Sequence, residues 1–129
     1  MKIDKDIIAG IKFNQDGLVP AIAQQWDSGE VLMMAWMNAA SIEETLQTGH
    51  VCYFSRSRSK LWRKGESSGQ IQYLKEMLFD CDADTILLKV DQIGVACHTG
   101  RRSCFFNTVT SGKIIINQEV VIAPEKLYE

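Results

Sequence analysis

Residues 18–37 read LVPAIAQQWDSGEVLMMAWM, two apolar and partly β-branched runs on either side of a short polar segment. The polar segment at residues 27–30 combines Asp, Ser and Gly, a composition that is typical of a turn between two strands. We therefore predict a β-hairpin with strands at 18–26 and 31–37. Pro20 lacks a backbone donor, which favours a strand start or an edge strand for the first run.

The segments after the hairpin predict one helix and further strands. Asn38 or Ser41 can cap a helix over residues 39–48, with Glu44 completing a capping box for Ser41 and Gly49 at the C-terminal end. Strand patterns recur at residues 50–55, 71–79, 85–90, 105–110 and 113–116. Because no full-length helical crossovers separate these strands, we predict an α+β fold of mainly antiparallel strands with one or two short helices.

The composition indicates one globular domain over residues 1–129, with 46% hydrophobic and 23% charged residues. The net charge of −2 argues against nucleic-acid binding. The longest apolar run, 31–37, is shorter than the ~20 residues of a membrane-spanning helix, and the acidic N-terminus lacks a targeting pattern. We expect a cytoplasmic protein without nucleic-acid or membrane partners. The core is predicted to include Met33, Met34, Trp36 and Met37.

Residues 80–84 read DCDAD, a dense group of metal-ligating side chains. In an extended segment side chains alternate between two faces, so Asp80, Asp82 and Asp84 would line one face and Cys81 the other. Carboxylates suit Mg²⁺ and thiolates suit Zn²⁺, which predicts two separate metal sites. A solvated acidic turn is the alternative. An EF-hand is excluded, because Thr85 stands where that loop requires glycine.

The cysteines predict a zinc site. With no secretion signal, four cysteines favour metal binding or catalysis over disulfides. Cys81, Cys97 and Cys104 supply three thiolates and leave a fourth zinc position open, as in catalytic sites. His98 is the candidate general acid or base beside a zinc-activated water. Cys52 is distant in sequence and is assigned to the core as a small apolar residue.

Two basic segments predict a site for a phosphorylated, purine-like small molecule. Guanidinium groups and hydroxyls bind phosphate oxygens, and an aromatic ring can stack on a base. The candidate substrate-binding residues are Arg56, Ser57, Arg58, Trp62, Arg63, Lys64, Ser67 and Ser68 in the first segment, and Thr99, Arg101, Arg102 and Ser103 in the second. Together with the metal ligands, they indicate metal-assisted hydrolysis of a phosphorylated substrate.

Five motifs in series resemble the phosphoribosyl-AMP cyclohydrolases of histidine biosynthesis. They are WMN at 36–38, YFSRSR at 53–58, LWRKGESSG at 61–69, DCDAD at 80–84 and ACHTGRRSC at 96–104. The likeness covers about residues 18–106, with the motifs in the same order and at compatible spacing.

The resemblance implies an intertwined homodimer with zinc held by Cys81 of one chain and by Cys97 and Cys104 of the other. It also implies magnesium on Asp80, Asp82 and Asp84. The implied reaction is hydrolytic opening of the adenine ring of N1-(5-phosphoribosyl)-AMP between N1 and C6, which yields the phosphoribosylformimino carboxamide nucleotide. His98 would shuttle protons, and Trp62 or a neighbour would stack on the purine.

Two other functions are compatible with some of these features. A zinc-stabilised nucleotide-binding or regulatory module would use the cysteines structurally, with a fourth protein ligand on the metal. A zinc deaminase acting on a base would need an H-x-E motif with a P-C-x-x-C partner, and the sequence contains neither.

Overall fold

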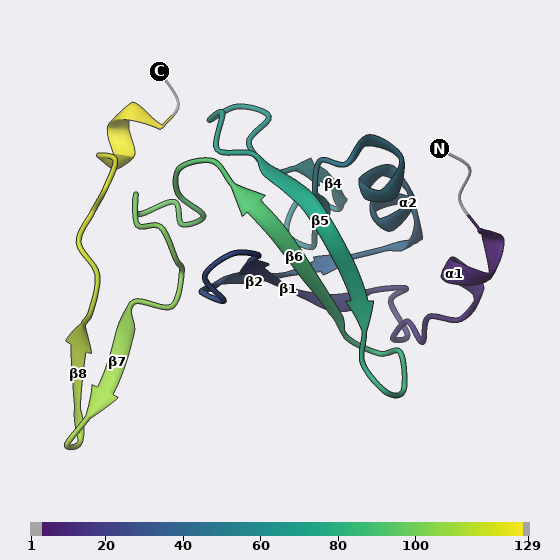
Figure 1. Cartoon of the computed structure of the whole chain (residues 1–129), viewed down its shortest axis with the longest axis horizontal. Coiled ribbons are helices and arrows are strands. Elements are labelled where there is room, and N and C mark those ends of the chain that lie inside the picture. Colours follow the sequence, from purple (N-terminus) through teal and green to yellow (C-terminus); the bar gives the residue numbers. More distant parts are fainter. Residues whose placement is uncertain (1–3, 128–129) are drawn as a thin grey trace.

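A six-stranded mixed sheet forms the body of the protein in the computed structural model, which describes residues 4–127 (Figure 1). The strand order is β4-β3-β2-β1-β6-β5. The strands are β1 (Val19–Gln25), β2 (Val31–Met37), β3 (Cys52–Ser55), β4 (Lys60–Arg63), β5 (Gln72–Phe79) and β6 (Ile86–Gln92). All neighbours are antiparallel except β1 and β6, which are parallel. The predicted α+β class, with mainly antiparallel strands, is therefore confirmed.

The predicted hairpin is present as β1 and β2, paired from Val19 opposite Met37 to Gln24 opposite Val31. Of the two positions predicted for Pro20, a strand start or an edge strand, the structure shows the first: Pro20 is the second residue of β1, which lies inside the sheet. Pairing of β1 with β6 begins at Ala21, one residue after Pro20. The missing N–H is therefore tolerated because Pro20 lies near the strand start, where β1 has only β2 as a neighbour.

Helix α2 (Ala39–Thr48) has the predicted bounds. Of the two candidate caps, Asn38 is the N-cap: its side chain accepts from the Ser41 amide at 2.8 Å, and Ser41 Oγ accepts from the Asn38 amide at 2.9 Å. The predicted Ser41–Glu44 box is wrong, because Ser41 occupies the third helical position and Glu44 binds Arg63 instead. A short helix α1 (Lys5–Ala9) and a 3-10 turn η1 (Pro124–Lys126) complete the helical elements.

The core lies on one face of the sheet, beneath α2. Side chains on β1 and β6 alternate between buried and half-buried, with Ala21, Ala23, Leu88 and Val90 all inaccessible to solvent. Ile42 of α2 is also fully buried in this cluster. Burial of this face fixes the register, since a one-residue slip would expose the whole apolar set.

The other face carries a second apolar row, which corrects the assignment of all four β2 residues to the core. Met33 and Met37 are buried, but Met34 is 47% exposed and Trp36 is half-buried. Met34 on β2 pairs with Ile22 on β1, and Ile22 also pairs with Leu87 on β6. Leu87 in turn pairs with Leu78 on β5. Directly opposed residues share a sheet face, so the row of Ile22, Met34, Leu78 and Leu87 crosses four strands.

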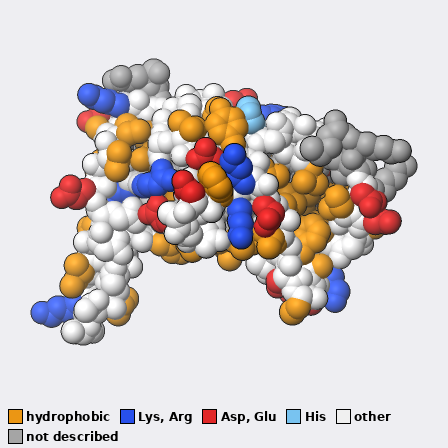
Figure 2. Space-filling view, viewed as in Figure 1, with side chains coloured by type: hydrophobic (Ala, Val, Ile, Leu, Met, Phe, Trp, Pro, Cys, Tyr) orange, Lys and Arg blue, Asp and Glu red, His pale blue; other side chains and the backbone are white. Residues whose placement is uncertain are grey.

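Strands β7 (Asn107–Thr110) and β8 (Lys113–Ile116) form a separate two-stranded arm with the predicted turn at Ser111 and Gly112. The arm extends away from the six-stranded sheet (Figure 1), and its surface carries apolar side chains (Figure 2). Its exposed residues are Val109 at 75%, Ile114 at 72%, Ile115 at 52% and Ile116 at 57%. Four large aliphatic side chains on one hairpin thus remain exposed in the single chain, a larger apolar patch than scattered surface residues form.

None of the helices within residues 4–127 has the length and apolar character needed to cross a membrane.

Cys52 is fully buried in β3, as predicted for a small apolar residue. Burial, assisted by the nearby Glu44 carboxylate, raises the pKa of its thiol to about 12. In the unfolded chain a thiol has a pKa of about 8.5. As the pH rises, the unfolded state therefore loses this proton first, and folding loses stability between these two values.

We therefore predict that Cys52→Ala reduces the alkaline loss of stability. Between about pH 8.5 and 12, Cys52 lowers the free energy of unfolding by at most ~1.4 kcal/mol per pH unit, the slope for one proton. Urea unfolding of both proteins at pH 7.5 and pH 10, at one protein concentration, measures the difference. Equal pH slopes for the two proteins would contradict the prediction.

Candidate active site

A cavity of about 970 Å³ opens between β2, the β3–β4 hairpin and the segment that follows β6. Of the residues proposed from sequence, it brings together Ser57, Arg58, Trp62, Arg63, Lys64, Ser67, Ser68, Cys97, His98 and Cys104. The cavity has the volume of a typical small-molecule site. Residues from the two basic segments and two of the three candidate zinc ligands thus line one space.

Cys97 and Cys104 lie side by side in the cavity wall, on the segment of residues 94–104, which we call the cysteine loop. Cys97 is buried, whereas Cys104 retains exposure. Desolvation, followed by the proximity of Cys97, raises the pKa of Cys104 to about 12. Thr99 Oγ1 donates a hydrogen bond to Cys97 Sγ at 3.1 Å. Two adjacent sulfurs, one of them hydrogen-bonded, are groups that could contribute to the ligand set of a soft metal.

His98 directly follows Cys97, is exposed and lines the cavity. Its imidazole is therefore available to a bound molecule next to the sulfur pair. This placement suits proton transfer to or from a reacting group.

The basic residues around the cavity differ in how they are engaged. Arg63 forms a two-point ion pair with Glu44, with both nitrogen–oxygen distances at 2.8 Å. Lys64 is buried, and its Nζ donates to the carbonyl oxygens of Gln70 at 3.1 Å and Val95 at 3.5 Å. Burial lowers the pKa of Lys64, while Cys104 and Cys97 oppose that shift. Neither side chain is free to bind a phosphate without giving up these partners.

Arg58 and Lys60 differ from these two residues, because neither side chain forms an ion pair or a hydrogen bond with another described residue. Both are exposed. Lys60 is not among the residues predicted from the sequence, although it lies within the same basic run. The ring of Trp62, 39% exposed, lies beside these groups in the lining.

Five of the proposed substrate-binding residues do not line the cavity. Arg56 stacks on Trp36, with its guanidinium carbon 4.7 Å from the ring centroid, and Thr99 binds Cys97. The other three, Arg101, Arg102 and Ser103, hold the cysteine loop to neighbouring segments. Arg101 Nε donates to Gln118 O at 3.0 Å, Arg102 binds Glu30 and Gly94 O, and Ser103 Oγ donates to Val31 O.

The aspartates converge in the turn between β5 and β6. One carboxylate oxygen each from Asp80, Asp82 and Asp84 lies within 4.8 Å of the others. The segment is not extended as the alternation argument assumed, because Ala83 has a φ of +59° and its amide binds Asp80 O. The turn, and not strand alternation, gathers the carboxylates. The neighbouring carboxyls of Asp82 and Asp80 raise the pKa of Asp84, the electrostatic strain that a bound cation would relieve.

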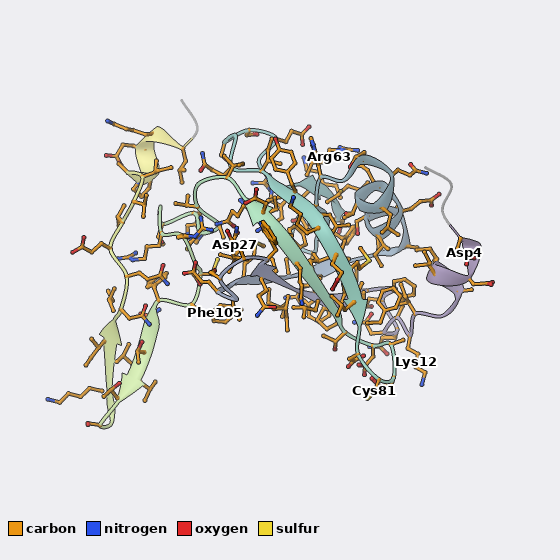
Figure 3. The ribbon with its side chains drawn as sticks, viewed as in Figure 1. Asp4, Lys12, Asp27, Arg63, Cys81 and Phe105 are labelled. Carbon is orange, nitrogen blue, oxygen red and sulfur yellow. The ribbon has the colours of Figure 1, made fainter. Side chains whose placement is uncertain are left out.

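Cys81 lies in the same turn, exposed and apart from the other two candidate zinc ligands. Among the described residues, the aspartates are the only three potential ligands that come together closely enough for one ion. Strand β6 separates the turn from the cysteine loop by seven residues, roughly 20 Å of extended chain. Figure 3 accordingly shows Cys81 far from Phe105, the residue after Cys104. One copy of the chain therefore does not assemble all three sulfurs.

Comparison with known proteins identifies the family. A family model described as phosphoribosyl-AMP cyclohydrolase matches residues 33–106. The phosphoribosyl-AMP cyclohydrolase of Paramagnetospirillum magneticum is 66% identical over 123 residues, covering 95% of this chain and 93% of that protein. The proteins of that name from Halorhodospira halophila and Acidiphilium cryptum are 60% and 68% identical, covering 95% and 81% of this chain and 86% and 90% of their own lengths.

The matches extend over the motifs on which the resemblance was based, and they cover the cavity wall, the aspartate turn and the cysteine loop. The chain belongs to the phosphoribosyl-AMP cyclohydrolase family of enzymes.

Proposed function

We propose that the protein catalyses the zinc-dependent hydrolysis of N1-(5-phosphoribosyl)-AMP, opening the adenine ring between N1 and C6 in a step of histidine biosynthesis. The observation that carries the proposal is the position of Cys97, Cys104 and His98 in the wall of a cavity that also presents Arg58 and Lys60. Soft ligands, a proton-transfer group and free cations are the components that hydrolysis of a phosphorylated purine requires.

The chemistry of the donors fits zinc. Cys97 and Cys104 offer two adjacent sulfurs, and Cys81 of a second copy would supply the third, leaving one coordination position open. When bound, zinc would act as a Lewis acid that makes a water nucleophilic near neutral pH. Thr99, by donating to Cys97 Sγ at 3.1 Å, would hold that sulfur in the orientation for binding.

The side chains around the sulfur pair would bind and orient the substrate. Arg58 and Lys60 would hold its phosphates as exposed cations, assisted by the serine hydroxyls of the lining. Trp62 offers a partly exposed ring for stacking on the purine. His98 would take a proton from the attacking water and return it to the departing N1 as the C6–N1 bond breaks. Alkylation at N1 already makes C6 electrophilic, so no further activation of the ring is needed.

We further propose that the active form is a homodimer whose zinc sites combine Cys81 of one chain with Cys97 and Cys104 of the other. The apolar row of Ile22, Met34, Leu78 and Leu87 and the exposed isoleucines of the β7–β8 arm support this assembly. Burying such surfaces between two copies removes apolar area from water, the main source of stability in obligate dimers.

The aspartate turn is proposed to bind Mg²⁺. Three carboxylate oxygens within 4.8 Å match the oxygen ligands that this ion prefers, and the magnesium would contribute to holding a substrate phosphate. The four free cysteines suit a reducing compartment, so we propose that the enzyme works in the cytoplasm.

Replacing Cys97 by serine should remove zinc and activity together, because a hydroxyl does not replace a thiolate as a soft ligand. The assay follows the ultraviolet change on ring opening of phosphoribosyl-AMP, with zinc content measured on the same sample. Cys52→Ser is the matched control, since it changes a cysteine outside the cavity. Full activity of the zinc-free Cys97 variant, or no ultraviolet change with the unmodified enzyme, would exclude the proposed reaction.

Placing a charge on the arm should weaken the dimer. Ile114→Lys puts an ammonium group in a surface that we propose to be buried between subunits. Gln47→Lys is the control, because it adds the same charge at a solvent-exposed position of α2. Native mass spectrometry should find the unmodified protein and the Gln47 variant at twice the chain mass and the Ile114 variant largely at the chain mass. A monomeric unmodified protein, or an Ile114 variant as dimeric as the control, would contradict this assembly.

A further inference from the structure

We infer that Gln92 is a positioning residue for the active site, because its side-chain amide binds both ends of the cysteine loop. This amide is the last member of a series of buried hydrogen bonds in which each side chain donates to the next. Gln92 is the last residue of β6 and is only 4% exposed. It lies outside the proposed substrate-binding and metal-binding residues, and it does not line the cavity.

The amide of Gln92 binds the two ends of the loop at once. Gln92 Nε2 donates to Gly94 O at 3.2 Å and to Arg102 O at 3.1 Å. Between these carbonyls lie Cys97 and His98. The same Arg102 carbonyl also accepts from the Ala96 amide at 3.0 Å, so the side chain of Gln92 and the backbone of the loop meet at one oxygen.

The two loop carbonyls determine how each side-chain amide in this hydrogen-bond series is oriented. Two carbonyl oxygens can only accept, so Gln92 must present its NH₂ group to them. Its Oε1 then accepts from Gln72 Nε2 at 3.0 Å, which leaves Gln72 Oε1 to accept from Tyr53 Oη at 2.6 Å. Tyr53 and Gln72 are both fully buried. A reversed amide would bring acceptors together without water, which is costly.

The backbone of Gln92 is fixed separately. The backbone N–H of Gln92 donates to Gln25 Oε1 at 3.0 Å. Gln25 Nε2 in turn donates to the carboxylates of Asp27 and Asp91, each at 3.1 Å. Gln25 is 5% exposed. Gln92 is therefore held in the sheet both through its backbone, by Gln25, and through its side chain, by Gln72.

The loop itself is closely fitted to its neighbours at the point where Gln92 binds. Gly94 has a φ of +74°, and a Cβ there would lie 1.6 Å from Gln70 Oε1, which accepts from the Val95 amide at 3.0 Å. Loosening one end of the loop would therefore displace the Cys97 sulfur. Removing a group that hydrogen-bonds a metal ligand directly typically weakens metal binding by about 10–100-fold. Gln92 acts through the backbone of the loop, so we expect the lower end of this range.

This inference rests on the proposed function in one respect, the assignment of Cys97 and Cys104 as zinc ligands. Two measurements separate them. Amide hydrogen exchange of Ala96 and Cys97 in metal-free protein reports the order of the loop without any assumption about zinc. Chelator competition then measures zinc affinity for the full-length protein.

The variants are Gln92→Met, which keeps the chain length but removes the amide, and Gln92→Asn, which keeps an amide too short to reach both carbonyls. Thr45→Val is the matched control: it removes buried hydrogen bonds to Ser41 and Cys52 at the junction of α2 and β3. Thermal unfolding compares the stability loss of the three proteins. Gln92→Asn, which retains a buried amide, keeps the test available if Gln92→Met does not fold.

We expect faster exchange of the Ala96 and Cys97 amides in both Gln92 variants and zinc binding weakened by about tenfold, the lower end of the range for supporting contacts. The Thr45 variant should match the unmodified protein in both respects at a comparable loss of stability. Unchanged exchange in the Gln92 variants, unchanged zinc affinity, or equal weakening by Thr45→Val would overturn the inference. If the unmodified protein binds no zinc, the proposed function fails, and the exchange result alone decides the role of Gln92.

Discussion

The parallel pairing of β6 with β1 is the constraint on which the site depends. It fixes β6 in the middle of the β1-β6-β5 part of the sheet, with the aspartate turn at its start and the cysteine loop after its end. A seven-residue strand holds these two groups of ligands roughly 20 Å apart. Cys81 can therefore join Cys97 and Cys104 around one ion only if a second chain provides it, so the proposed zinc site requires the proposed dimer.

The same pairing explains how a loop can present reactive groups accurately. The cysteine loop leaves β6 directly, so its geometry is set by a strand whose alternate side chains are packed in the core. Arg102 and Ser103 then hold it to Glu30 and Val31 O, and Gln92 binds the carbonyl oxygen of Gly94 within the loop. The polar side chains of this segment therefore mainly position the loop. Among the described residues of the cavity, Arg58 and Lys60 are the Lys and Arg side chains without a hydrogen-bond or ion-pair partner.

Elements with local signals were predictable from the sequence. The β1–β2 hairpin, α2 with its Gly49 end and the β7–β8 turn each depend on residues close in sequence, and all three are present. Strand β4 was missed because its pairing partner β3, and not its own basic composition, makes it a strand. The parallel β1–β6 pair could not be predicted, since it depends on which distant strands meet.

The candidate site divides in the same way. The sequence motifs predicted residues that the fold brings together, since Cys97, His98 and Cys104 line the same cavity as Arg58 and Trp62; their chemical roles stay predictions. How Arg101, Arg102 and Lys64 are used could not be predicted, since their partners Gln118, Glu30 and Val95 lie far along the chain. Gln92 has a recognisable sequence signal: it continues the alternation of Ile86, Leu88 and Val90, a position that indicates a buried amide needing partners.

The most direct test of a zinc site shared between chains is a hybrid dimer of Cys81→Ser and Cys104→Ser chains, isolated with two different affinity tags. Each parent homodimer lacks a ligand in both sites, whereas the hybrid has one complete site and one doubly defective site. The account predicts inactive parents and a hybrid with about half the activity and zinc content of the unmodified dimer, as twofold symmetry requires. A hybrid as inactive and zinc-free as its parents would contradict it.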